Sequence, residues 1–243
     1  MQRYFIWLAF DGARYHGWQI QPNGDSVQEE LQHALSLLLR SDIGVVGAGR
    51  TDAGVHARMM VAHFDSEDSI DTQQLAYRLN KMLPKDISIH EVKPVDAAMH
   101  ARFSAKWRTY HYYIHTVKDP FVAGYSCELH YPLDFELMNE AASHLLEVDD
   151  FGSFCKVHTD VKTTICNVVD ARWVRDDECH WHFVIRANRF LRNMVRAVVG
   201  TLIEVGRHRI SIDEFDRIVA GRCRSDAGES MPAKALFLEC VEY

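Results

Sequence analysis

The sequence predicts an α+β protein made of two similar halves. Residues 1–105 run in the order strand, helix, strand, strand, helix, strand, and residues 106–243 run strand, helix, hairpin, helix, helix and strand. The first order is that of a ferredoxin-like unit. We therefore expect two ferredoxin-like (RNP-like) halves whose antiparallel sheets meet at a central cleft, a common place for a functional site.

Apolar periodicity and turn residues mark the elements of the first half. Ser26 is placed to cap a helix over 27–40, with Leu31 and Leu35 on its apolar stripe. The loop before this helix contains YHGW, whose aromatic side chains we expect to be exposed. The other expected elements are strands at 3–10, 44–47, 58–66 and 87–95, and a helix at 71–83 that Pro84 stops.

The second half opens with a strand at 106–117 that is rich in aromatic residues. Beyond it the same patterns predict three helices, one hairpin and a final strand. The expected elements are a helix at 135–148, a hairpin at 168–188 that turns at RDDE, helices at 190–206 and 211–221, and a final strand at 235–243.

The composition is that of an ordinary globular protein, with 47% hydrophobic and 25% charged residues. No apolar run approaches the roughly 20 residues that a membrane span needs, and the apolar N-terminus lacks the cleavage site of a signal peptide. The six cysteines form no Cys-x-x-Cys pair. We expect reduced thiols and a cytoplasmic protein.

The formal net charge of −7 argues against a nucleic-acid partner when it is taken alone. The distribution of charge matters more than its sum, because a basic surface can attract anions in an acidic protein. Residues 186–203 contain four arginines and no acidic residue, whereas acidic residues gather at 134–150 and 211–216. We therefore still expect an anionic partner.

The stretch GAGRTDAGVHA, residues 47–57, is the least regular part of the first half. Its closely spaced glycines are typical of a special turn or of close approach to a ligand. Within it, Asp52 either caps a turn or stands in the loop as a nucleophile or base, with Arg50 beside it to favour the ionised carboxylate. The stretch lacks the Gly-Lys-Ser/Thr of a phosphate-binding loop.

Two groups of side chains in the second half have the chemistry of RNA contacts. Arg189, Arg192 and Arg196 share one face of the helix predicted after the hairpin, and this face either is solvated or binds phosphates. Tyr110 and Tyr112 share one face of the aromatic strand, where they either pack in a core or stack on bases.

Histidines on the expected strands raise the alternative of a metal site. His111 and His115 share one strand face, and His180 and His182 share another. No Cys or third ligand follows at a diagnostic interval, so we expect no metal.

These segments together resemble the tRNA pseudouridine synthase A family. GAGRTDAGVHA is similar to the family signature, DGARYHGWQIQPNGDSVQEEL to its N-terminal loop and helix, and FSAKWRTYHYYI to its tyrosine-bearing strand. DFGSFC and RANRFLRNMVRAVVGTLIEVG are similar to two further segments, so the resemblance extends over essentially the whole chain. One departure is Ala235, which stands where the family usually has glycine before its final strand.

The resemblance implies an isomerase that converts uridine to pseudouridine in the anticodon stem-loop of tRNA, at tRNA positions 38–40, with no metal and no cofactor. It assigns the nucleophile to Asp52, the tyrosine that stacks on the target uracil to Tyr110, and the arginine that pairs with the nucleophile to Arg196. It also implies a homodimer in which one tRNA contacts both subunits, with no membrane involved. We expect further RNA contacts from Arg50, His56, Arg58, Arg189 and Arg192.

This reaction gives the glycines of the signature a function. The target uridine must leave its stack to reach the carboxylate, and we expect Gly47, Gly49 and Gly54 to clear space for its ribose beside Asp52. Two alternatives stay open: an RNA-binding module without catalysis, and a hydrolase that uses Asp52 as a base. The sequence also leaves open whether Asp52 attacks C1′ or C6.

Overall fold

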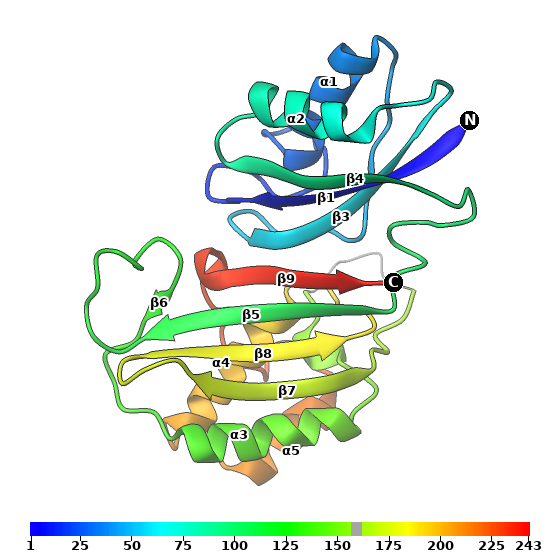
Figure 1. Cartoon of the computed structure of the whole chain (residues 1–243). Coiled ribbons are helices and arrows are strands. Elements are labelled where there is room, and N and C mark those ends of the chain that lie inside the picture. The colour runs from blue at the N-terminus through cyan, green and yellow to red at the C-terminus, as the bar shows by residue number, and fades with distance from the viewer. Residues whose placement is uncertain (157–161) are drawn as a thin grey trace. The chain divides into compact units, whose positions relative to one another are not determined.

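The computed structural model describes residues 1–156 and 162–243, and the chain divides into two compact units (Figure 1). The first unit is Met1–Lys106 with Phe237–Tyr243, and the second is Trp107–Leu236. Each unit packs helices on a β-sheet, so the prediction of a fold with both helices and sheets is confirmed. The expected division into 1–105 and 106–243 gave the last strand to the second half, whereas compactness groups residues 237–243 with the first unit.

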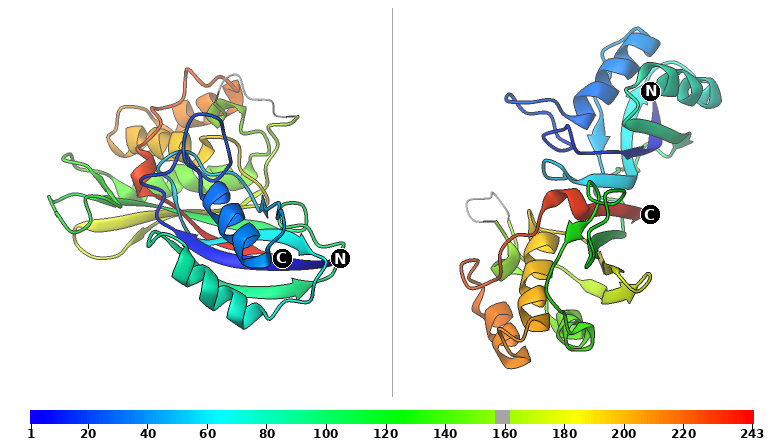
Figure 2. Two further views of the ribbon diagram at one scale, coloured as in Figure 1. Left: turned by 90° about the horizontal axis from the view of Figure 1, so that it is seen from above. Right: turned by 90° about the vertical axis from the view of Figure 1, so that its left-hand side faces the viewer.

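The first unit is a sheet with two helices on one face, which lie side by side in both figures (Figures 1 and 2). Strand β1 pairs antiparallel with β3 and β4, and the short β2 pairs antiparallel with β3. Strand β9, from the far end of the chain, pairs parallel with β3. The elements are β1 (Gln2–Phe10), α1 (Val27–Leu39), β2 (Val46–Gly47), β3 (His56–Ser66), α2 (Thr72–Met82), β4 (Ile87–Val95) and β9 (Leu236–Glu242).

The helices of the first unit begin where the sequence predicts, because a side-chain cap precedes each. Ser26 Oγ accepts a hydrogen bond from the backbone N–H of Glu29 at 3.3 Å, and Asp71 Oδ1 accepts one from Gln74 at 3.0 Å. Such caps satisfy N–H groups that the first turn of a helix leaves unpaired. The predicted apolar stripe of α1 is buried on the sheet, with Leu31 and Leu35 fully enclosed.

The second unit has its helices gathered on one face of its strands (Figure 2). Strand β8 pairs antiparallel with β5 and β7, and the short β6 pairs parallel with β5. The elements are β5 (Trp107–His115), β6 (Cys127–Glu128), α3 (Phe135–His144), β7 (Val168–Arg175), β8 (His180–Ala187), α4 (Met194–Gly206) and α5 (Ile212–Gly221), with 3₁₀ turns at Leu145–Glu147, Gly152–Phe154 and Ala233–Ala235.

Helix α4 starts four residues later than predicted. Asn193 has a left-handed backbone with φ of 68°, a conformation that asparagine tolerates and that ends a right-handed helix. Residues 188–193 are therefore irregular, and the Arg192 carbonyl accepts from Lys156 N at 3.1 Å. The prediction that three arginines share one helical face is wrong: Arg196 lies on α4, whereas Arg189 and Arg192 precede it.

Helix α4 forms the centre of the second unit and is buried along nearly its whole length. Ala235, at the end of the last 3₁₀ turn, is fully buried as well. Its backbone is not left-handed, so this position accepts alanine in place of glycine without backbone strain. Within residues 1–156 and 162–243, no helix is both long and apolar enough to cross a membrane.

Candidate active site

The loop that carries Asp52 joins β2 to β3 in the first unit. Asp52 is half-buried, between the buried Thr51 and the exposed Ala53. The Asp52 carbonyl accepts a hydrogen bond from Val55 N at 3.1 Å, and Gly54 within this turn has a left-handed φ of 77°. The loop therefore turns sharply just after Asp52, and Asp52 itself stays partly exposed.

The backbone of this loop is fastened to the loop that follows β1. The Trp18 N–H lies 3.1 Å from Thr51 Oγ1, and the Gly54 N–H donates to the Tyr15 carbonyl at 3.3 Å. Both aromatic side chains are 2% exposed. The expectation that these aromatics are exposed is therefore wrong: both are buried, the indole of Trp18 lies against Gly47, and the backbone of both residues bonds to the loop.

The glycines of the signature differ in what surrounds them. A Cβ on Gly47 would collide with the indole of Trp18, whereas a Cβ on Gly49 would meet no atom of the described residues within 4 Å. Gly54 supplies the left-handed turn. The explanation that all three clear space for a ribose is therefore wrong for Gly47, whose space is taken by the indole.

Two predicted site residues near the start of β3 differ in burial. His56 is 1% exposed, and its ring stacks on Phe237 with centroids 4.6 Å apart. Its Nδ1 lies 3.0 Å from Gly12 N and 2.9 Å from Asp11 Oδ1. Arg58 is exposed and its Nε lies 3.0 Å from Glu239 Oε1. His56 is thus placed to support the loop, and Arg58 lies at the surface of the unit.

Arg50 is exposed in the loop itself, two residues before Asp52. Four predicted site residues, Arg50, Asp52, His56 and Arg58, therefore lie within one short stretch of the first unit. The remaining four, Tyr110, Arg189, Arg192 and Arg196, belong to the second unit.

Tyr110 and Tyr112 occupy different environments in β5. Tyr112 is fully buried, its hydroxyl donates to the Pro232 carbonyl at 3.0 Å, and burial raises its pKa. Tyr110 is half-buried, and its ring meets that of Phe190 edge-on with centroids 4.9 Å apart. Tyr112 is thus a core residue, whereas Tyr110 remains partly exposed.

The predicted arginines flank the start of α4. Arg189 is half-buried and Arg192 is exposed. Arg196 Nε donates to the Met231 carbonyl at 2.5 Å, and Met231 N donates back to the Arg196 carbonyl at 3.2 Å. This reciprocal pair orients the Arg196 side chain along the segment that leads to β9.

The segment beside Arg196 is fixed by close packing and side-chain hydrogen bonds. A Cβ on Gly200 would collide with the Glu229 carbonyl, and Thr201 Oγ1 accepts from Gly228 N at 2.9 Å. Ser230 Oγ accepts from Asn193 Nδ2 at 2.5 Å. The sequence interpretation missed this support, although glycines at 200 and 228 are a signal for close backbone approach.

The histidines of β5 and β8 bond to neighbouring side chains. The rings of His111 and His182 lie 4.8 Å apart, and His182 Nδ1 is 2.9 Å from Asp176. His115 is fully buried and its Nδ1 lies 2.9 Å from Ser126 Oγ. In the part of the chain that the structure describes, no three His, Cys, Asp or Glu side chains form a group that could hold a metal ion.

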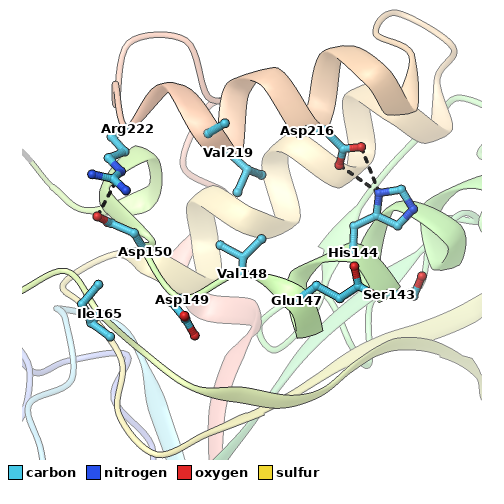
Figure 3. A pocket seen from close by; sticks show the side chains of 11 residues that line it. Ser143, His144, Glu147, Val148, Asp149, Asp150, Ile165, Asp216, Val219 and Arg222 are labelled. Atoms are coloured by element: carbon cyan, nitrogen blue, oxygen red, sulfur yellow. Dashed lines mark hydrogen bonds and ion pairs between the residues drawn. The ribbon is translucent and has the colours of Figure 1, made fainter.

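A pocket of about 940 Å³ lies in the second unit beside α3 and α5 (Figure 3). Four carboxylates line it, from Glu147, Asp149, Asp150 and Asp216. Its basic side chains are paired within the pocket: Arg222 Nε lies 3.1 Å from Asp150, and His144 Nδ1 lies 2.9 Å from Asp216. Such a lining repels phosphate, and none of the predicted site residues lies in it.

The comparisons with known proteins agree on one family. The family model described as "tRNA pseudouridine synthase" matches residues 6–104 and 141–243. The chain is 57% identical to tRNA pseudouridine synthase A of Bacteroides fragilis, over 100% of this chain and 97% of the relative. It is 56% identical to the protein of that name from Bacteroides thetaiotaomicron, over 100% and 91%, and 52% identical to that from Parabacteroides distasonis, over 100% and 96%.

The class of the protein follows from these matches together with the fold. It is a mixed α and β enzyme of the isomerase class that modifies tRNA. The chain belongs to the tRNA pseudouridine synthase family. The resemblance seen in the sequence is therefore confirmed, and a binding module without catalysis is not supported.

Proposed function

We propose that this enzyme isomerises uridine to pseudouridine in the anticodon stem-loop of tRNA, at positions 38–40, with Asp52 as the nucleophile. One observation carries the assignment to Asp52. Its loop is bonded on both sides of the residue, through Thr51 and Gly54, to a second loop of the same unit. A carboxylate presented from a fixed backbone meets the geometric requirement of nucleophilic catalysis.

The reaction balances without an oxidant or a co-substrate. The N1–C1′ bond breaks, the uracil turns, and C5 bonds to C1′. C5 then loses its proton while N1 regains one, so the product is an isomer of the substrate. Asp52 would hold the nucleotide covalently between the two bonds, at C1′ or at C6, and its carboxylate is regenerated at the end.

Tyr110 and Arg196 are proposed as the other catalytic residues. The half-buried ring of Tyr110 supports a stacking role, and its hydroxyl could take the C5 proton. The resemblance assigns Arg196 as the partner of Asp52, and its bond to the Met231 carbonyl favours a fixed orientation of the guanidinium. A charge pair of this kind positions the carboxylate more than it stabilises the fold, because desolvation offsets the attraction.

Contacts to the tRNA backbone are proposed for Arg50, Arg58, Arg189 and Arg192, which are exposed or half-buried. His56 was expected among them, but its burial and its contacts with Asp11, Gly12 and Phe237 support a role under the loop. We also propose, from the resemblance, two ferredoxin-like halves, a homodimer that binds tRNA with both subunits, and action in the cytoplasm.

The proposed reaction is tested with tRNA whose uridines are tritiated at C5. Only substitution at C5 releases this label, so the purified enzyme should release tritium while producing no free uracil. A tRNA with cytidine at positions 38–40 serves as the control and should release none. Free uracil in place of released tritium would favour the hydrolase, and release from the control tRNA would overturn the proposed position.

A further inference from the structure

We propose that Thr51 is a positioning residue for the Asp52 carboxylate, and that it acts through the loop Gly12–Trp18. This inference rests on the proposed role of Asp52 as nucleophile. Thr51 immediately precedes Asp52 and is 9% exposed. Its hydroxyl group therefore points into the unit, where its hydrogen-bond partner belongs to the fold.

One backbone N–H group faces two acceptors of Thr51, its side-chain hydroxyl and its carbonyl oxygen. The Trp18 N–H lies 3.1 Å from Thr51 Oγ1 and 3.4 Å from the Thr51 carbonyl oxygen. The hydroxyl is the nearer acceptor of this three-centre bond. Removing it leaves the longer bond alone, so the backbone just before Asp52 is held less firmly.

The two loops approach each other too closely for ordinary side chains. Gly17 has a left-handed φ of 100°, and a Cβ there would collide with the Thr51 carbonyl. A Cβ on Gly12 would collide with the Val55 carbonyl at the other end of the turn. Backbone thus meets backbone on both sides of Asp52, and the Gly12–Trp18 loop acts as a brace for it.

The brace is itself anchored at two points, Tyr15 in its middle and Trp18 at its end. The buried Tyr15 donates its hydroxyl hydrogen to Asp86 Oδ1 at 2.8 Å, and burial raises its pKa to about 12, so the hydroxyl stays protonated at neutral pH. The Trp18 carbonyl accepts from Gln28 N at 2.9 Å, in the first turn of α1. A shift of α1 or of the start of β4 would therefore pass to the Asp52 loop.

A carboxylate nucleophile depends strongly on its position, because a displacement of about 1 Å can cost about 100-fold in rate. Binding of tRNA involves many contacts away from Asp52 and depends little on this one hydrogen bond. Loss of the Thr51 hydroxyl should therefore lower kcat and leave the Kd for tRNA unchanged. If Thr51 had only a structural role, its substitution would lower the melting temperature without separating the effect on kcat from the effect on Kd.

The test compares Thr51→Val, which keeps the shape of the side chain, with Thr51→Ser, which keeps the hydroxyl. We expect Thr51→Val to lower kcat for tritium release by roughly 10- to 100-fold, with the Kd for tRNA within about twofold. Thr51→Ser should restore kcat to within about threefold of the wild type. Thr116→Val is the matched control, because it removes a hydroxyl that bonds the Cys179 carbonyl in the second unit; it should retain wild-type kcat.

Tyr15→Phe provides a second variant, which removes the anchor to Asp86 together with the hydrogen bond that the Tyr15 hydroxyl accepts from Arg14. It should lower kcat by a smaller factor than Thr51→Val, again without a change in Kd. Wild-type kcat in Thr51→Val would overturn the inference. Equal losses of kcat in Thr51→Val and Thr51→Ser would overturn it too. Asp52→Asn, assayed in parallel, separates the two proposals: an active Asp52→Asn contradicts the nucleophile itself, whereas an inactive Asp52→Asn beside a fully active Thr51→Val contradicts only the positioning role.

Discussion

The backbone around Asp52 and the side chain of Arg196 are held in place by different kinds of contact. Both lie next to irregular backbone, and each is held by a stretch of chain distant in sequence. At Asp52, backbone bonds to backbone and glycines allow the contact. At Arg196, the guanidinium itself bonds to the Met231 carbonyl, and Ser230 and Asn193 fix the neighbouring chain. The first arrangement sets the position of a backbone, and the second sets the direction of one side chain.

This difference predicts that a methyl group added to a glycine lowers kcat more beside Asp52 than beside Arg196. Gly17→Ala places a Cβ against the Thr51 carbonyl at a left-handed φ, which should cost roughly 1–3 kcal/mol of unfolding free energy and lower kcat by more than about 100-fold. Gly200→Ala also places a Cβ against a backbone carbonyl, that of Glu229, and should lower stability as well. Its loss of kcat should be smaller, because it displaces the segment beside Arg196 and leaves the backbone of the proposed nucleophile in place. Tritium release and urea unfolding measure both effects.

Matched glycines elsewhere provide the controls for these two variants. Gly44 and the helical Gly221 have no described atom within 4 Å of an added Cβ. Gly44→Ala and Gly221→Ala should therefore keep wild-type kcat and stability. A Gly17→Ala enzyme as active as Gly44→Ala would show that backbone contact does not hold the Asp52 loop.

Substitutions of Tyr110 test whether the second unit contributes a ring, a hydroxyl or both. Base stacking is worth about 1–3 kcal/mol, so Tyr110→Ala should lower kcat/KM by roughly 10- to 100-fold. If the hydroxyl takes the C5 proton, Tyr110→Phe should still form the covalent tRNA adduct but stall before tritium is released. Adducts are detected as tRNA retained with protein on a denaturing gel. Wild-type activity of Tyr110→Ala would remove this residue from the site.

Acid should destabilise the first unit through His63 on β3. Burial lowers the pKa of His63 to about 4, from an ordinary value near 6.5. Between these values the unfolded chain binds a proton that the folded chain does not, so stability falls as the pH falls from 6.5 to 4. We expect a loss of about 2 kcal/mol between pH 7.5 and pH 5. Urea unfolding of His63→Asn, which keeps an acceptor for Ala101 N, should show a shallower dependence; an unchanged slope would contradict the assignment.

The smallest expected effects concern the arginines that precede α4. If Arg189 and Arg192 meet phosphates, each change to Ala should weaken tRNA binding modestly and reduce the slope of log Kd against log salt by about one. Their kcat should hold at saturating tRNA, in contrast to Arg196→Ala, which should lose rate more than affinity. Unchanged slopes in the salt titrations would show that Arg189 and Arg192 do not contact phosphates and lie on an ordinary solvated surface.

Local chemistry made much of the fold predictable from the sequence. Ser26 and Asp71 cap helices where the sequence indicates, and strand β4 has the expected bounds. The errors come from long-range contacts. Nothing local to Trp18 reveals that it lies under Gly47, and the left-handed Asn193 that delays α4 is stabilised by Ser230, 37 positions away. The parallel pairing of β9 with β3 likewise joins His56 to Phe237.

The same limit applies to the candidate site. The glycine-rich stretch identified the Asp52 loop, because glycine spacing and the Arg-Thr-Asp sequence are local signals. The brace was missed, since its contacts join residues more than thirty positions apart and its aromatic side chains were interpreted as exposed. Burial of His56 was likewise not visible in the sequence, because Asp11 and Phe237 lie far from it along the chain.

The most direct measurement is tritium release by Asp52→Asn from tRNA tritiated at C5 of uridine, with tRNA affinity measured on the same preparation. Asparagine has nearly the same shape as aspartate but cannot act as a carboxylate nucleophile. Release should fall by at least about 1,000-fold, while affinity should hold or rise because a negative charge facing phosphates is removed. Asp52→Ala, which cannot revert to aspartate by deamidation, should behave in the same way. Tritium release within about tenfold of the wild type in both variants would contradict Asp52 as the nucleophile.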